Sequence, residues 1–166
     1  FSVTDIEELI DLSTSLAASS FAEDTATGTT IATASVTSEA GNAITFSLSG
    51  AGSENFSISS DGTISLANTL DYETTSSYTL TLTATDGNST TNSDISFVIN
   101  NVNEAPTLST SVASSSFSED VSTGTTIATA SATDPENAII SYSLSGNGSD
   151  KFSVASDGTV TLSSAL

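Results

Sequence analysis

Apolar and polar residues alternate with a period of two along most of this chain. The alternation is cleanest at Tyr78, Leu80, Leu82 and Ala84, where the residues in between are all threonines. This pattern places apolar side chains on one face of a β-strand and polar side chains on the other. No stretch shows a helical period of useful length. The sequence therefore predicts an all-β fold.

Between residues 12 and 104 the pattern predicts about seven short strands in roughly 95 residues, the usual size of a Greek-key immunoglobulin-like sandwich. An edge strand is expected near Leu12 to Ser20. The other strands are marked by alternating apolar positions, namely Ala32, Ala34 and Val36; Ile44, Phe46 and Leu48; Phe56 and Ile58; Ile64 and Leu66; Tyr78 to Ala84; and Ile95, Phe97 and Ile99. Asp61-Gly62 predicts a hairpin turn, because both residues tolerate positive φ.

The sequence repeats itself with an offset of 96 residues. Residues 1–70 superimpose on residues 97–166 without a gap, and 37 of the 70 aligned pairs are identical. The segment Thr27 to Ser35 recurs letter for letter at Thr123 to Ser131. Such repetition is typical of tandem domains that share one fold. We therefore expect the end of a preceding repeat and its linker at 1–11, a complete repeat at 12–104, and a second repeat at 105–166 that lacks its last strands.

The strongly negative net charge of the chain limits the kinds of partner that it can bind. The chain carries 20 acidic residues against one basic residue, Lys151, and its formal net charge is −19. We expect no nucleic-acid or anionic-lipid partner, because both attract positively charged proteins. Cations are favoured, although an acidic surface also keeps a Ser- and Thr-rich protein in solution. The absence of cysteine excludes disulfides and thiolate metal sites, and the short apolar runs predict no transmembrane segment.

The segment Asn101 to Pro106 ends one predicted strand and precedes the next. Pro106 lacks a backbone N–H and favours an extended conformation in the residue before it, so it interrupts the strand ladder. Three side chains here carry oxygen acceptors, those of Asn101, Asn103 and Glu104, and no basic residue lies beside them. A linker of this kind is suited to joining two domains and to binding a hard cation, which prefers oxygen ligands.

Several motifs follow one another in a fixed order. Phe56-Ser57-Ile58 precedes Asp61-Gly62-Thr63-Ile64, then come Leu70-Asp71-Tyr72-Glu73 and the strand Tyr78 to Gly87, and Glu23 and Glu119 occupy matching early positions. In this order and spacing the motifs resemble the cadherin repeat, in the form found in large bacterial surface proteins and adhesins. They are similar to its central hairpin, its Leu-Asp-x-Glu motif, its Tyr-x-Leu-x-Val-x-Ala-x-Asp strand and its early glutamate. The resemblance covers about residues 12–166.

The resemblance implies tandem cadherin-like sandwiches on an extracellular or cell-surface protein, with calcium bound at the junction between successive repeats. Carried over position by position, it implies eight metal ligands: Glu23, Asp71, Glu73, Asn101, Asn103, Glu104, Asp134 and Glu136. The linker departs from the family pattern, with Asn101 in place of the usual aspartate and one residue fewer before Ala105-Pro106. The amide lowers the ligand charge, which should weaken calcium affinity.

An earlier junction is also implied, with a weaker ligand set. Ser38 and Ala40 occupy the positions that align with Asp134 and Glu136. The remaining candidates are Asp5, Glu7, Glu8 and Asp86, with Glu39 as a substitute. We therefore expect the better calcium site at residues 101–104.

Two functions remain open from the sequence. One is calcium-dependent homophilic cell adhesion, in which the repeats contact other copies of the same protein or cell-surface ligands. The other is a passive, calcium-stiffened spacer that presents another binding or enzymatic module. We expect no catalysis, because no histidine is available to activate a serine and the only lysine is Lys151. A glycosidase-type carboxylate pair stays open as an alternative, although the carboxylates are expected at domain ends and not in a cleft.

Overall fold

The computed structural model describes residues 10–38 and 42–166 and divides the chain into two units, Phe1–Val102 and Asn103–Leu166. The regular elements of the described residues are strands, together with two single-turn 3-10 helices, Ser53–Asn55 (η1) and Ser149–Lys151 (η2). The all-β prediction is confirmed. Within the described ranges, no helix has the length and apolar character needed to cross a membrane.

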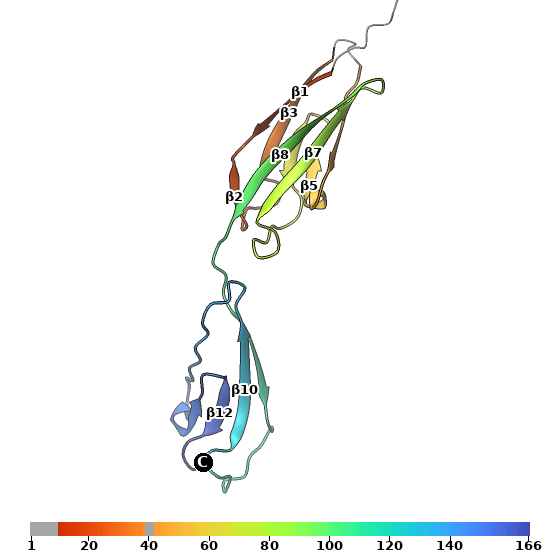
Figure 1. The fold of residues 1–166 in the computed structure, drawn as a ribbon. Coiled ribbons are helices and arrows are strands. Elements are labelled where there is room, and N and C mark those ends of the chain that lie inside the picture. The colour runs from red at the N-terminus through yellow and green to blue at the C-terminus, as the bar shows by residue number, and fades with distance from the viewer. Residues whose placement is uncertain (1–9, 39–41) are drawn as a thin grey trace, which may run out of the picture. The chain divides into compact units, whose positions relative to one another are not determined.

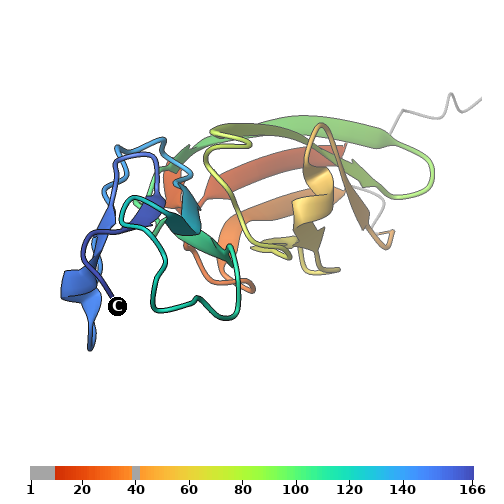
Figure 2. The ribbon, with the colours of Figure 1, turned by 90° about the horizontal axis from the view of Figure 1, so that it is seen from below.

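The first unit is a sandwich of two four-stranded sheets. Its strands are β1 (Ile10–Leu16), β2 (Ser20–Ala22), β3 (Thr30–Ser38), β4 (Thr45–Ser49), β5 (Phe56–Ile58), β6 (Thr63–Leu66), β7 (Ser77–Thr85) and β8 (Thr90–Asn100). One sheet has the order β1-β3-β6-β5 and the other β2-β8-β7-β4. Figure 2 shows the two layers, with the green strands β7 and β8 over the red and orange strands β1 and β3.

The edge strand predicted near Leu12 to Ser20 is divided between the two sheets. Its first part, β1, pairs antiparallel with β3, whereas β2 pairs in parallel with β8 (Figure 1). The Ala17 N–H donates to the Ile31 carbonyl at 2.8 Å, and the Val98 N–H donates to the Ser19 carbonyl at 3.2 Å, so the crossing lies between these contacts. Alternation marks a strand but does not specify its sheet. The crossing brings the residue after β2 beside the end of β8.

Inward-facing side chains from both sheets form the core of the first unit. Ile31, Ile64 and Leu80 are fully buried, and each such side chain contributes about 1.5–3 kcal/mol relative to an exposed one. Four rings pack at one place, with centroids 5.1 to 5.6 Å apart, and they belong to Phe21, Phe56, Tyr78 and Phe97. Three of the four ring contacts are edge-to-face, a geometry that aromatic pairs prefer.

The second unit contains one sheet. Its strands are β9 (Thr107–Val112), β10 (Thr126–Thr133), β11 (Phe152–Val154) and β12 (Thr159–Leu162). They are ordered β11-β12-β10-β9 and pair antiparallel, as the aligned strands β5, β6, β3 and β1 do. Residues 141–145, which align with β4, are not a strand, and the described residues of this unit form no second sheet.

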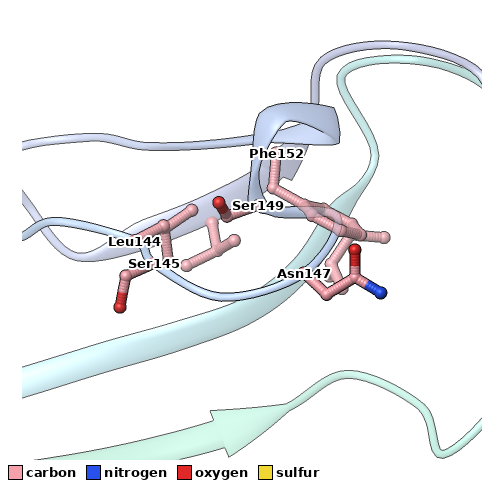
Figure 3. A pocket seen from close by; sticks show the side chains of 7 residues that line it. Leu144, Ser145, Asn147, Ser149 and Phe152 are labelled. Atoms are coloured by element: carbon pink, nitrogen blue, oxygen red, sulfur yellow. The ribbon is translucent and has the colours of Figure 1, made fainter.

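Most core positions of the second unit are less buried than their counterparts, although Leu162 is 1% exposed, as the aligned Leu66 is. Ile127 is half-buried, whereas the aligned Ile31 is fully buried. A hollow of about 250 Å³ opens above the sheet (Figure 3). Its apolar lining comes from Ile127, Leu144, Phe152 and Val160. The second unit therefore has one sheet, the counterpart of one of the two layers in the first unit.

Candidate metal site

Glu23 is a buried carboxylate at the end of β2. Phe21 and Glu23 lie two residues apart and both face the interior, with exposures of 9% and 7%. The Glu23 N–H donates to the Asn100 carbonyl at 3.1 Å, which extends the pairing of β2 with β8 by one residue. Its Oε2 accepts the Tyr72 N–H at 2.6 Å, and its Oε1 accepts the Val102 N–H at 2.7 Å. One side chain thus connects three segments of the first unit.

Asp71 opens a tight turn and caps it with its own side chain. Its Oδ1 accepts the Thr74 N–H at 2.9 Å, and its Oδ2 accepts the Thr74 hydroxyl, also at 2.9 Å. The Thr75 N–H donates to the Asp71 carbonyl at 2.9 Å. This is the aspartate-turn pattern, in which a short side chain satisfies nearby backbone donors. The turn fixes Asp71 and leaves Glu73 exposed.

Three carboxylates converge in the first unit. Glu23, Asp71 and Glu73 each offer one oxygen, and these oxygens lie within 4.8 Å of one another. The Asn101 side-chain N–H donates to Glu73 Oε1 at 2.6 Å, so the Asn101 side-chain oxygen is the atom left to bind a cation. Two carboxylates about 5 Å apart repel by about 3 kcal/mol at an effective dielectric near 20. The chain's one basic side chain, Lys151, donates to a backbone carbonyl in the second unit.

A second group of predicted ligands lies within the second unit. Asp134 Oδ1 accepts the N–H groups of Glu136 and Ala138, both at 3.1 Å. The Glu104 N–H donates to Glu136 Oε1 at 3.1 Å, and the Asn103 side chain donates to the Glu104 carbonyl at 3.0 Å. Glu136 Oε2 is buried and has no hydrogen-bond partner among the described residues. An orphaned buried oxygen of this kind is costly unless a cation or donor satisfies it.

The eight predicted ligands therefore fall into two groups of four, one in each unit. The first group is Glu23, Asp71, Glu73 and Asn101, and the second is Asn103, Glu104, Asp134 and Glu136. Each group supplies three carboxylates and one side-chain amide. These oxygen donors are of the kind that calcium binds, in flexible geometry. The backbone donors of Tyr72 and Val102 were not predicted, but the Asp71-x-x-Thr74 spacing was a readable signal for the turn.

The earlier junction is represented by one described candidate, Asp86. Its Oδ1 accepts the N–H groups of Asn88 at 2.9 Å and Ser89 at 2.8 Å, and its Oδ2 accepts the Ser38 hydroxyl at 3.4 Å. The backbone N–H groups of Ser89 and Asn88 hold the pKa of Asp86 below its usual value. The other candidates lie outside the described residues: Asp5, Glu7, Glu8 and Glu39.

Asp61 and Asp157 belong to turns and to neither ligand group. The Asp61 carboxylate accepts the Ser59 hydroxyl and, at 3.0 Å, the Thr63 N–H. These bonds, the Ser59 bond above all, lower the pKa of Asp61. In the second unit, Asp157 Oδ1 accepts the Thr159 N–H at 2.9 Å. The hairpin turn predicted at Asp61-Gly62 is confirmed, since it joins β5 to β6.

Comparison with known proteins gives a consistent family. The family model for the cadherin domain matches residues 18–102. The mouse cadherin EGF LAG seven-pass G-type receptor 1 is 40% identical over 134 residues, which cover 74% of this chain and 4% of the receptor. The human receptor of the same name is 39% identical over 132 residues, again 4% of its length. The chain thus spans a small part of the curated relatives it matches.

Solved structures agree with this match. Repeats EC22-24 of mouse cadherin-23 superimpose with a TM-score of 0.54 at 30% identity, covering 96% of this chain and 55% of that one. Repeats EC1-2 of human protocadherin-24 give a TM-score of 0.55 at 20% identity, covering 89% and 75%, which is evidence for the fold alone. The family match and the two-sheet sandwich of the first unit lead to one conclusion: this chain belongs to the cadherin family.

Proposed function

We propose that this chain is part of an extracellular cadherin-type adhesion protein that binds calcium at the junction between its repeats. The observation that carries the proposal is the convergence of Glu23, Asp71 and Glu73, whose oxygens lie within 4.8 Å of one another. The first unit contains no basic side chain, since the chain's one lysine, Lys151, belongs to the second unit. The membership of the cadherin family supports an extracellular, adhesion-type role.

Both ligand groups are proposed to act on the same ions. Asn101 closes the first group and Asn103 opens the second, so only Val102 separates them along the chain. The orphaned Oε2 of Glu136 supports a role for the second group, because a bound cation would satisfy it. Bound calcium would supply the positive charge that these carboxylates lack. Glu73 and Asp71 would hold the ion from one repeat, and the second group from the next.

The expected consequence is a junction that stiffens when calcium is present. Without the ion, the carboxylates repel one another and favour arrangements that separate them. An ion that binds only the folded, assembled ligand set stabilises that state by mass action. We propose that calcium in this way limits the motion between neighbouring repeats and makes the protein a stiffer rod.

Thermal unfolding in calcium and in chelator tests this proposal. At ten times the dissociation constant, one bound ion adds about 1.4 kcal/mol of stability, which corresponds to roughly 3–6 °C for a chain of this size. We therefore expect a higher melting temperature in calcium, with magnesium at the same concentration as the control for ionic strength. Superimposable melting curves in calcium and chelator would contradict the proposal.

A passive spacer is the second candidate, and the outer face of the β2-β8-β7-β4 sheet favours it. Outward residues of β7 and β8 bond to each other there, Thr79 with Ser96 at 3.0 Å and Thr81 with Asp94 at 2.8 Å. Binding hot spots are usually aromatic or arginine side chains, and this ladder offers neither. Beads coated with the protein distinguish the two functions: calcium-dependent aggregation indicates homophilic adhesion, and dispersed beads that still bind calcium indicate a spacer.

A further inference from the structure

Glu23 uses its carboxylate differently from Asp71 and Glu73, the other carboxylates of the first ligand group. It is 7% exposed, and its two oxygens accept backbone N–H groups 49 and 79 residues away, those of Tyr72 and Val102. The hydrogen bonds of Asp71 reach only three residues along the chain, to Thr74. Glu73 is exposed, and it accepts a hydrogen bond from the exposed side chain of Asn101. Within the first ligand group, Glu23 is the carboxylate whose hydrogen bonds join distant parts of the backbone.

We propose that Glu23 is a calcium-independent latch, a positioning residue that assembles the first ligand group before any ion binds. Its carboxylate joins the turn after Leu70 and the end of β8 to the end of β2. Hydrogen bonds to an ionised acceptor are about twice as strong as neutral ones, and burial shields them from water. The inference rests on the proposed function only for the identity of the ion. The latch itself is a property of the ion-free protein.

The two latched amides are placed where they can position ligands. Tyr72 lies between Asp71 and Glu73 in the sequence, and Val102 directly follows Asn101. Fixing these two backbone positions therefore fixes the starting points of three candidate ligand side chains. A site that is held in place before its ligand arrives loses less entropy on binding. The latch should thus strengthen calcium binding indirectly, besides any direct contact with the ion.

The aligned residue of the second unit indicates that tertiary contacts form the latch. Glu119 aligns with Glu23 within a common Phe-x-Glu-Asp sequence, yet it is exposed and accepts no hydrogen bond among the described residues. The second unit also has no described counterpart of the sheet that contains β8 and β7. The same local sequence therefore gives a solvated glutamate where the second sheet is not in place.

Two matched variants test the latch in chelator, where calcium plays no part. Glu23→Gln and Glu73→Gln each remove one charge from the cluster with little change in volume. Glutamine at position 23 keeps one acceptor and places an NH₂ group against the other N–H, so the melting temperature should fall by on the order of 5 °C. Glutamine at position 73 keeps an acceptor for Asn101 and relieves repulsion, so the melting temperature should stay or rise.

Amide hydrogen exchange in chelator locates the effect. In Glu23→Gln, the Tyr72 and Val102 amides should exchange at least about tenfold faster, while the Leu80 amide in the core stays protected at temperatures below the transition. Glu23→Asp keeps the charge but is shorter by one methylene, and it should also lower the melting temperature. Unchanged exchange at both amides, or a Glu23→Gln melting temperature at or above wild type, would overturn the latch. Absence of calcium binding by calorimetry would overturn only the proposed function.

Discussion

The two units contain one identical stretch of sequence in two different surroundings. Residues 27–35 and 123–131 read the same, and β3 and β10 pair with equivalent neighbours in the same order. Ile31 in β3 is nevertheless fully buried, whereas Ile127 in β10 is half-buried. The difference is the β2-β8-β7-β4 sheet, which covers the sheet that contains β3 in the first unit. The second unit has no described counterpart of this covering sheet. Local sequence thus specifies pairing within the sheet that contains β3, and the facing sheet completes the burial of Ile31.

A second pair of aligned segments shows that strand formation, like burial, depends on the surrounding structure. Residues 45–49 form β4 because they pair antiparallel with β7, from Thr45 opposite Thr85 to Ser49 opposite Thr81. Residues 141–145 have a similar alternating sequence, but no described strand pairs with them, and they are not a strand. Alternation provides the two faces of a strand. The backbone hydrogen bonds that make it a strand must come from a partner.

The largest expected effect tests the contrast in burial. Ile31→Ala should reduce the free energy of unfolding of the first unit by about 3 kcal/mol, because the surrounding sandwich cannot relax fully into the cavity. Ile127→Ala should cost about 1 kcal/mol or less, because a half-buried side chain loses little on truncation. Hydrogen exchange with mass spectrometry can follow each unit separately in denaturant. Equal losses in the two units would contradict the role given to the second sheet.

A smaller effect should be shared by the two units, because it is local. Gly62 and Gly158 have φ values of +84° and +82°, and an added Cβ would approach a backbone oxygen to 2.5 Å at Ala34 and 2.0 Å at Ala130. Alanine at either position should cost about 1–3 kcal/mol. Gly28→Ala is the control for the close contact: its φ is +86°, so the backbone conformation is the same, but nothing lies within 4 Å of an added Cβ. Denaturant unfolding followed by hydrogen exchange measures each cost, and an effect confined to one unit would break the comparison.

The smallest expected effect is the pH dependence of the two aspartate turns. Hydrogen bonds hold the pKa values of Asp61 and Asp157 below the usual 3.8. Both groups therefore add stability above about pH 4, and this contribution is lost as the pH falls through the lowered pKa values. Asp61→Asn keeps an acceptor for Thr63 but does not titrate. Its melting temperature should depend less on pH than that of wild type between about pH 4 and pH 2.

Features set by neighbouring residues were predictable from the sequence. The alternation of β7 and the turn at Asp61-Gly62 depend on side chains a few residues apart, and both are present. The division of the first edge strand was not predictable, because β1 and β2 choose their sheets through contacts with β3 and β8. Nor does the alternation at residues 141–145 show whether a partner strand is present.

Part of the candidate site was likewise predictable from the sequence, and part was not. The family resemblance predicted its side chains, and the structure brings Glu23, Asp71 and Glu73 together. The amides of Tyr72 and Val102 were missed, because a backbone donor leaves no trace in the pattern of side chains. Their role appears only once β2 is placed beside β8.

Calcium titration calorimetry tests the central claim most directly. Three proteins are compared: wild type, Glu73→Gln and the control Asp94→Asn. Asp94 lies on the outer face of β8 and accepts a hydrogen bond from Thr81. Each variant removes one carboxylate, but only Glu73→Gln removes it from a ligand group. The proposal predicts saturable calcium binding by wild type, binding weakened by about tenfold or more in Glu73→Gln, equivalent to about 1.4 kcal/mol, and unchanged binding in Asp94→Asn. Absence of saturable binding by wild type, or equal affinities for all three proteins, would contradict it.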